Sequence, residues 1–366
     1  MALIIKKIKN SITESVKKML EELKYTPAKE KIFIKPNIAI PTWPTSPYIT
    51  NPLVVAGVID YLKEKGFTDI LVGDGPVPID FPVEETFSVC GYREICKGVK
   101  LVNIDLLSKK KINSIYLPEI VFEREYINVS KLKSHYQTTV SLGLKNQKGL
   151  LSPENKNLFH RNLHRNIAEL ASVISPSLSI IDGTNGLEGN GPAELGKEVT
   201  NLNLLLGGTT FLALDQLACT VIGVDYKKVD HLRFAEERGL KGLESEIITG
   251  EKVEKVFHQF ALPSSYWKKG NLYYYWSDYT CSKCSLVEGR IIEKIDEIPL
   301  EILEKIPPSA FITGTPKNNI PEGFNVYCLG KCASLYCKGT YSLSGCPPDI
   351  NKVLNLLSTV ITDNKE

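Results

Sequence analysis

The pattern that most constrains this fold is a strand, a helix and a second strand that follow one another near the start of the chain. The apolar run Lys31–Pro36 predicts a short buried strand that the proline ends. The segment Asn51–Gly66 predicts a helix, because Asn is a favourable N-cap, Pro52 suits the first turn and Gly ends helices. Asp69–Asp74 predicts the second strand. Strands joined by a helical crossover pair in parallel, so the sequence predicts a parallel sheet.

The same alternation continues along most of the chain. Further strands are predicted at Leu101–Asp105, Glu125–Val129, Leu178–Asp182 and Leu202–Leu206, and helices at 11–24, Phe159–Ser172, Leu212–Ile222 and Lys228–Arg238. We therefore expect an α/β protein with a mostly parallel sheet flanked by helices, and a smaller C-terminal cysteine-rich metal-binding region. Ligands of open parallel sheets bind beyond the C-terminal ends of the strands, where the polar loops of this chain are predicted.

The charge balance and the apolar runs exclude some classes of protein. The chain has 44 Lys and Arg against 42 Asp and Glu, which argues against a domain held on nucleic acid by bulk electrostatics. The N-terminal apolar run is only Ala2–Ile5, and no stretch of about 18 apolar residues occurs, so we expect neither a secretory signal nor a membrane-spanning helix. We expect a cytoplasmic protein. Its expected partner is a small-molecule substrate or a redox partner protein, with a homodimer left open.

The composition changes after about residue 260. The segment Tyr266–Trp276 is rich in aromatic residues, and six of the nine cysteines lie between residues 281 and 346. In a reducing compartment, clustered cysteines more often indicate metal or redox chemistry than structural disulfides. We predict an α/β domain over residues 1–260 and a cysteine-rich, iron–sulfur-binding region over residues 261–366.

The clustered cysteines predict a site with four thiolate ligands. Cys281 and Cys284 form a Cys-X2-Cys pair, and Cys328, Cys332, Cys337 and Cys346 follow at spacing Cys-X3-Cys-X4-Cys-X8-Cys. Two thiolates from one tight turn and two from a second segment suit either zinc or an iron–sulfur cluster. A third possibility is cysteines without any metal. We favour the cluster, because a proline directly after the last cysteine is typical of ferredoxin-type ligation. The remaining Cys90, Cys96 and Cys219 are expected in the core.

A group of basic residues follows one predicted strand. Lys131, Lys133, His135, Lys145 and Lys148 lie within a short stretch of the sequence. They indicate an anion site in which the histidine serves as acid, base or metal ligand. The alternative is a solvated basic loop with a hydrogen-bonded histidine.

Two other polar segments are weaker candidates. His160 and His164 are four residues apart on a predicted helix, so they share a face and could flank a substrate or a metal. The glycine-rich segment Asp182–Pro192 contains Glu188 and allows close approach of a ligand to the backbone, although it matches neither a Walker loop nor a dinucleotide fingerprint. The strand end Lys35–Asn37 could face the same crevice.

These segments together resemble one family, the proteins that share domain of unknown function number 362, over roughly residues 30 to 245. The resemblance rests on Lys35–Asn37, Val129–His135 with Leu144–Asn146 and Gly149, Asp182–Gly183 with Glu188–Pro192, and Leu214–Asp215 to Gly223. Members often carry a C-terminal iron–sulfur cluster. The resemblance implies Cys281, Cys284, Cys332 and Cys346 as its ligands, because Gly345-Cys346-Pro347-Pro348 is similar to one of the family's arrangements. Cys328 and Cys337 would be additional.

A more distant similarity concerns the nickel-pincer lactate racemases. His135, Lys145 and His160 occur in the order of a catalytic His, a cofactor-bearing Lys and a metal-ligand His in those enzymes. This chain has Leu142-Gly143-Leu144 where they have paired glycines. The similarity implies that His135 and Lys145 line the active crevice, and it is not evidence for nickel.

Three functions follow from these observations. The first is an iron–sulfur oxidoreductase or electron-transfer component that holds a [4Fe–4S] cluster and acts on a small anionic substrate. The second is a non-redox racemase-like or isomerase-like enzyme with structural cysteines, and the third is a binding protein stabilised by zinc. The predicted site residues are His135 and Lys145 for catalysis, Lys35, Asn37, Lys133, Asn146, His160, Asp182 and Glu188 for substrate binding, and Cys281, Cys284, Cys332 and Cys346 for the metal.

Overall fold

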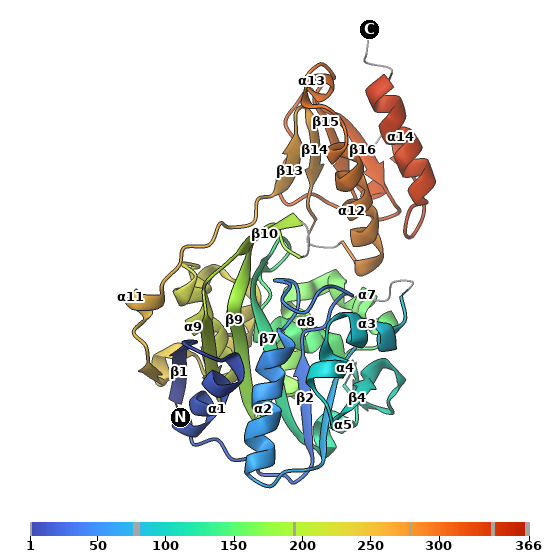
Figure 1. Cartoon of the computed structure of the whole chain (residues 1–366). Coiled ribbons are helices and arrows are strands. Elements are labelled where there is room, and N and C mark those ends of the chain that lie inside the picture. Colours follow the sequence, from blue (N-terminus) through green and yellow to red (C-terminus); the bar gives the residue numbers. More distant parts are fainter. Residues whose placement is uncertain are drawn as a thin grey trace. The chain divides into compact units, whose positions relative to one another are not determined.

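The protein consists of two compact units, seen in a computed structural model that describes residues 2–75, 81–113, 115–192, 195–277, 280–337 and 341–362. The first unit comprises Met1–Lys156 and His164–Pro263. The second comprises Asn157–Leu163 and Ser264–Glu366, and most of it is orange to red in Figure 1.

The first unit is built on a large mixed sheet. Among the described residues its strands follow the order β12–β1–β11–β9–β7–β2–β3–β4, with β10 beside β9 and β8 beside β7. The strands from β9 through β7, β2 and β3 to β4 are all parallel, which confirms the predicted α/β class with a mostly parallel sheet. The bounds are β1 (Ala2–Lys7), β2 (Ile32–Pro36), β3 (Ile70–Asp74), β4 (Lys100–Asn103), β7 (Glu125–His135), β8 (Thr139–Val140), β9 (Leu178–Gly189), β10 (Gly196–Val199), β11 (Leu204–Gly208) and β12 (Ile247–Gly250), and a separate hairpin pairs β5 (Lys109–Ile112) with β6 (Ile115–Pro118).

The chain adds strands to the sheet in opposite directions on the two sides of the β2–β7 pair. From β2 the chain crosses through α2 (Pro52–Glu64) to β3, whereas from β7 it crosses through α8 (Leu163–Val173) to β9 on the opposite side. Both crossovers are of the right-handed kind only if the two helices cover opposite faces, and Figure 1 shows α2 in front of the sheet and α8 behind it. The topological switch point therefore lies at the C-terminal ends of β2 and β7. Open parallel sheets bind ligands at such points.

Helices cover the sheet through a continuous apolar core. On one face, α1 (Ile12–Glu22) and α2 bury Val16, Met19 and Val58 against strand residues such as Ile34 and Val129. Ser11 caps α1 by accepting the N–H of Glu14. The other helices of this unit are α3 (Val83–Val89), α4 (Tyr92–Ile95), α5 (Ile120–Glu123), α6 (Gly143–Asn146), α9 (Phe211–Val221), α10 (Asp230–Glu237) and α11 (Val253–Val256), while α7 (Pro153–Phe159) runs into the segment that belongs to the second unit.

Two buried salt bridges connect neighbouring strands near the switch point. Lys35 at the end of β2 contacts Asp74 at the end of β3, with 2.8 Å between Nζ and Oδ1. Lys131 on β7 contacts Asp182 on β9, with 2.9 Å between Nζ and Oδ2. Both pairs are almost fully shielded from solvent. Each carboxylate also accepts a backbone N–H, from Ile38 and Asn51 respectively, which satisfies the buried charges.

The second unit has a smaller sheet in the order β13–β14–β15–β16–β17. The strands β14 to β17 are parallel, and β13 pairs with β14 in an antiparallel hairpin. The bounds are β13 (Tyr266–Lys269), β14 (Leu272–Tyr275), β15 (Ser309–Ile312), β16 (Asn325–Leu329) and β17 (Ser342–Leu343), with helices α12 (Ser282–Asp296), α13 (Leu300–Leu303) and α14 (Ile350–Thr362). Across both units, no described helix combines the length and apolar character needed to span a bilayer.

Three of the predicted segments have a different extent or conformation in the structure. The predicted strand Glu125–Val129 extends to His135, so the Lys-His segment is largely strand. The expected glycine-rich loop after Asp182 continues β9 to Gly189 and pairs with β10 in a hairpin. The predicted helix Phe159–Ser172 is interrupted at His160–Asn162 by one 3-10 turn. In the first two cases pairing with other strands decides the local conformation, and sequence periodicity does not contain this information.

The buried pair on β7 and β9 yields a stability prediction. Lys131→Met would leave the Asp182 carboxylate buried without its cation, so we expect the free energy of unfolding to fall by about 3–5 kcal/mol. Denaturant unfolding followed by circular dichroism measures this loss. The exposed Lys227 is the matched control, and Lys227→Met should change stability by no more than about 0.5 kcal/mol. A loss for Lys131→Met as small as that of the control would contradict the assigned role.

Candidate functional site

Polar side chains at the end of β2 and on the neighbouring elements contact one another in a buried network near the switch point. Besides Asp74, Lys35 Nζ donates to Asn146 Oδ1 at 3.2 Å, and Asn146 Nδ2 donates to Asn128 Oδ1 at 2.8 Å. A Cβ at Gly149 would lie 2.5 Å from Asp74 Oδ1 and 2.7 Å from Lys35 Nζ, so only glycine fits there. Lys35 and Asn146 therefore hold the strand ends together and offer little to a ligand.

Three more of the predicted substrate-binding residues also have internal partners. Asp182 accepts from Lys131 and from the N–H groups of Asn51 and Thr184. Glu188 is half-buried and accepts the N–H of Ala261 at 2.8 Å. The Asn37 amide donates to the carbonyl of Tyr48 at 3.0 Å. Asn37 follows β2 at the switch point, where its side-chain oxygen is the atom to consider for a ligand.

Lys133 lies further along β7, beside the buried pair of Lys131 and Asp182. Its ammonium donates to the carbonyl of Tyr48 at 2.8 Å and has no carboxylate in direct contact among the described residues. Burial lowers the pKa of Lys133 to about 7, and the charges of Lys131 and Lys35 add to this effect. Lys133 therefore changes its charge near neutral pH and is suited to bind an anion that restores the proton.

Lys145 is carried by the short helix α6, which two buried groups hold in place. Asp215 on α9 accepts the N–H groups of Gly143 and Leu144, each at 2.8 Å, and Asn128 donates to the carbonyl of Gly143. Burial raises the pKa of the Asp215 carboxyl to about 7. Burial also lowers the pKa of Lys145 well below its usual value, with Lys148 and Lys133 adding repulsion. Lys145 therefore loses its proton more readily than an exposed lysine does.

The two histidines of the predicted site belong to different units. His135 ends β7, is nearly buried, and its Nδ1 accepts the N–H of Gln137 at 3.1 Å. In the neutral ring, Nε2 therefore carries the proton. His160 belongs to the segment Asn157–Leu163 of the second unit, so the first-unit site is described without it.

Some residues of the first-unit site were not singled out from the sequence. Lys156 donates to the carbonyl of Gly75 and contacts Asp105, which forms a third lysine–carboxylate pair beyond the strand ends. In the sequence, only the family motif at Leu214–Asp215 indicated that Asp215 could be important. Neither residue could have been connected to α6 or β3 without the long-range contacts of the fold.

In the second unit, the four predicted metal-binding cysteines all follow the C-terminal ends of parallel strands. Cys281 and Cys284 come after β14, Cys332 after β16 and Cys346 after β17. The C-terminal ends of parallel strands meet at one edge of a sheet. The β14–β17 edge is therefore where these thiols can converge.

Hydrogen bonds and electrostatic interactions at this edge of the sheet connect the segments that contain the cysteines. The Cys284 thiol donates to Cys281 and lowers the pKa of Cys281 to about 5, helped by backbone N–H groups at the start of α12. The hydrogen bond to Cys281 and burial raise the pKa of Cys284, and Cys332 lies close enough to add a smaller effect. The N–H of Lys331 donates to the carbonyl of Gly345 at 2.9 Å, next to Cys346.

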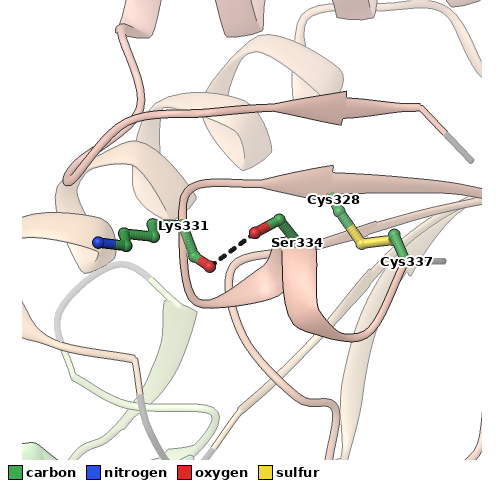
Figure 2. Close-up of a disulfide and its surroundings, with 4 residues drawn as sticks. All are labelled: Cys328, Lys331, Ser334 and Cys337. Atoms are coloured by element: carbon green, nitrogen blue, oxygen red, sulfur yellow. Dashed lines mark hydrogen bonds between the residues drawn. A yellow bond between two sulfur atoms is a disulfide. The ribbon is translucent and has the colours of Figure 1, made fainter. Parts of the chain in front are cut away.

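The two additional cysteines form a disulfide, shown in Figure 2. Cys328 and Cys337 have a Cα–Cα distance of 6.1 Å, and Cys328 packs in an apolar cluster with Tyr275 and Ile312. Between them the chain turns tightly, and the Ser334 hydroxyl donates to the carbonyl of Lys331 at 2.8 Å. The disulfide therefore closes the loop that contains Cys332. Cys90, Cys96 and Cys219 are buried in the first unit, as expected for core residues.

The donor set of this edge fits a cysteine-bound metal centre in its chemistry. Cys281 is a favoured thiolate, and thiolate is the form that binds iron or zinc. Within the described residues, however, no three His, Cys, Asp or Glu side chains are gathered as the ligands of a single ion would be. The ligand set therefore stays a prediction.

Comparison with known proteins gives two matches. The model of the family described as Domain of unknown function (DUF362) matches residues 32–220, which include the parallel strands and the lysines of the switch point. The chain is also similar to the thylakoid-associated protein sll1697 of Synechocystis sp., with 25% identity over 255 residues. That alignment covers 65% of this chain and 78% of the cyanobacterial protein.

The pKa of Lys133 gives a prediction for the pH dependence of anion binding. Because its folded-state pKa is lowered to about 7, Lys133 is neutral above that pH and charged below it. Oxalate, a dianion throughout this range, should therefore bind more tightly as the pH falls through about 7. Isothermal titration calorimetry measures the affinity on either side of that value. Lys133→Met should bind more weakly at low pH and lose most of the pH dependence, and an unchanged dependence would show that another group is responsible.

Proposed function

The chain belongs to the DUF362 family, and we propose that it is an iron–sulfur protein that acts on a small anionic substrate. The cysteine-rich edge of the second unit would hold a [4Fe–4S] cluster, and the switch point of the first unit would bind the substrate. The protein would then be an oxidoreductase or an electron-transfer component. A cytoplasmic location is part of this proposal, because a reducing compartment keeps the four predicted ligand cysteines available as thiols.

One observation carries the cluster proposal: three strands of one parallel sheet each end in a segment that brings a predicted cysteine ligand. Cys281 and Cys284 occupy a single helical turn, with the first poised as a thiolate. The Lys331 to Gly345 hydrogen bond ties the segment of Cys332 to that of Cys346. When bound, the cluster would supply one-electron transfer.

A buried network behind Cys284 would hold its helix in place. Glu288 is one turn further along α12 and is almost fully buried. It accepts hydrogen bonds from Tyr274 at 2.9 Å and Thr313 at 2.6 Å. Tyr274 is on β14 and Thr313 follows β15, so the network fixes α12 against both strands. A fixed helix keeps the two sulfurs of Cys281 and Cys284 oriented toward the same point.

The anion site would use residues of the switch point in separate roles. Lys133 would supply a positive charge when an anion raises its pKa, and Lys148 lies near enough to Lys145 to affect its pKa. His135 presents a ring whose Nε2–H can donate a proton or a hydrogen bond. Lys145 differs from these because burial and the neighbouring Lys148 and Lys133 lower its pKa well below the usual value, which makes it a weaker cationic anchor.

A second candidate is a non-redox isomerase-like enzyme in which the cysteines are structural. The lowered pKa of Lys145 favours it, because a lysine that loses its proton more readily than usual is suited to acid–base work on an anionic substrate. Zinc in place of the cluster would support this second candidate or a binding protein without catalysis.

Metal analysis of anaerobically purified protein tests the proposal. We expect about four iron and four sulfide per chain, and broad absorption near about 400 nm that bleaches with dithionite. Serine at Cys281, Cys284, Cys332 or Cys346 should each lower the iron content strongly, because each variant removes one thiolate. Cys90→Ala, in the core of the first unit, is the matched control and should keep the iron.

The alternatives give different results in the same measurement. A colourless protein with about one zinc per chain would replace the cluster with a structural metal. If Cys328→Ser or Cys337→Ser removes the iron while Cys346→Ser does not, the ligand set is wrong although a cluster exists. Full retention of iron in all four serine variants would overturn the proposed centre.

A further inference from the structure

The loop that connects β2 to α2, residues 37–50, carries an exposed tryptophan. The side chain of Trp43 is 52% exposed, although tryptophan is among the residues with the largest apolar surface to bury. Its ring packs against Tyr48 in a T-shaped arrangement, with 5.7 Å between the ring centroids. Because a T-shaped contact covers at most one face of the indole, another face is left for a ligand to cover.

Hydrogen bonds hold the β2–α2 loop in place at its ends and in its middle. At the ends, the carbonyl of Asn37 accepts the N–H of Thr50 at 2.9 Å, and the Thr50 hydroxyl donates to the carbonyl of Val129 on β7 at 2.8 Å. In the middle, the Asn185 amide on β9 donates to the carbonyl of Thr45 at 2.9 Å. An aromatic ring on a loop that is already ordered loses little conformational entropy when a ligand binds to it.

Tyr48 connects Trp43 to the residues of the proposed anion site. Its carbonyl oxygen accepts hydrogen bonds from Lys133 Nζ at 2.8 Å and from Asn37 Nδ2 at 3.0 Å. The side chain of the same tyrosine contacts the Trp43 ring. The ammonium and the exposed indole are therefore linked through a single residue, so a small ligand that binds the first is within reach of the second.

From this geometry we propose that Trp43 is a stacking surface at the anion site, and that the ligand of this site is an aromatic carboxylate. The carboxylate would bind the ammonium of Lys133, and the aromatic ring would stack on the indole of Trp43. This inference rests on the anion site proposed above and names its substrate class.

The number of uncompensated charges favours a single carboxylate over a polyphosphate. Lys35 and Lys131 each contact an aspartate, whereas Lys133 contacts none among the described residues. One cation without a carboxylate partner matches one carboxylate, and a chain of phosphates would need several cations or a metal ion.

The exposed ring favours a planar aromatic group over a saturated one. Aromatic rings attract each other in offset-stacked or edge-to-face arrangements, beyond the gain from buried area alone. A saturated ring of the same size buries at least as much apolar surface, so burial alone would favour the saturated ligand or neither. A preference for the aromatic ligand therefore reports contact with another ring.

Isothermal titration calorimetry with a matched pair of acids tests this stacking on the whole protein. The acids 3-phenylpropanoate and 3-cyclohexylpropanoate have the same carboxylate and the same flexible spacer, and oxalate serves as an anion without a ring. The titrations are made at about pH 6, where Lys133 is charged because its pKa is about 7. We expect 3-phenylpropanoate to bind about threefold or more tighter than 3-cyclohexylpropanoate.

Variants at Trp43 assign the preference to this ring. Trp43→Leu should bind the two ring acids with equal affinity, because leucine is apolar but not aromatic, and Trp43→Phe should keep part of the preference. Both variants should bind oxalate as the unchanged protein does. Ile247→Ala, which removes a 70% exposed apolar side chain on β12, is the matched control and should keep the full preference.

The outcomes separate the stacking surface from the anion site. Oxalate binding without a preference between the ring acids, or a preference that survives in Trp43→Leu, would overturn the stacking surface and leave the anion site standing. If none of the three acids binds, both the anion site and the stacking surface are overturned.

Discussion

The first unit depends on buried lysine–aspartate pairs at the ends of its parallel strands. Lys35 with Asp74 joins β2 to β3, and Lys131 with Asp182 joins β7 to β9 on the other side of the switch point. Each ion would be very costly to bury alone, so both members must be present and correctly placed together. The pairs therefore fix the relative positions of four strand ends. The loops that follow these strands start from fixed positions for the same reason. Lys133, which is predicted to bind an anion, lies on β7, so the Lys131–Asp182 pair also helps to fix its position.

Much of the fold could be predicted from local sequence. The β2–α2–β3 unit is specified by its apolar runs and by the capping residues Asn51 and Pro52, and these interactions are local. The strand β1 was not predicted, because its pairing with β11 and β12 joins residues that are about two hundred positions apart in the chain. The hairpin of β9 and β10 was mistaken for a loop for a related reason. Its glycines suggest a turn, whereas cross-strand hydrogen bonds to β10 keep it extended.

The candidate site shows the same division between local and long-range information. The sequence identified the basic residues after one strand, but it could not distinguish paired lysines from unpaired ones. Lys35 is predicted to bind substrate, and in the structure it forms half of a buried pair with Asp74. Lys145 was selected from the basic group and from the family resemblance, and its lowered pKa arises from burial and from the charges of Lys148 and Lys133. The distinction depends on which carboxylate each amine meets, and those carboxylates come from distant strands and helices.

The segment Asn157–Leu163 groups with the second unit, while the residues on both sides of it belong to the first. The polypeptide thus changes unit three times, at 156/157, at 163/164 and at 263/264. A gene fusion or a deletion with a single breakpoint at 263/264 could not transfer the whole second unit. The segment Asn157–Leu163 would remain with the first unit. In evolutionary terms, the two units are expected to be inherited together, whatever partner or substrate each has acquired.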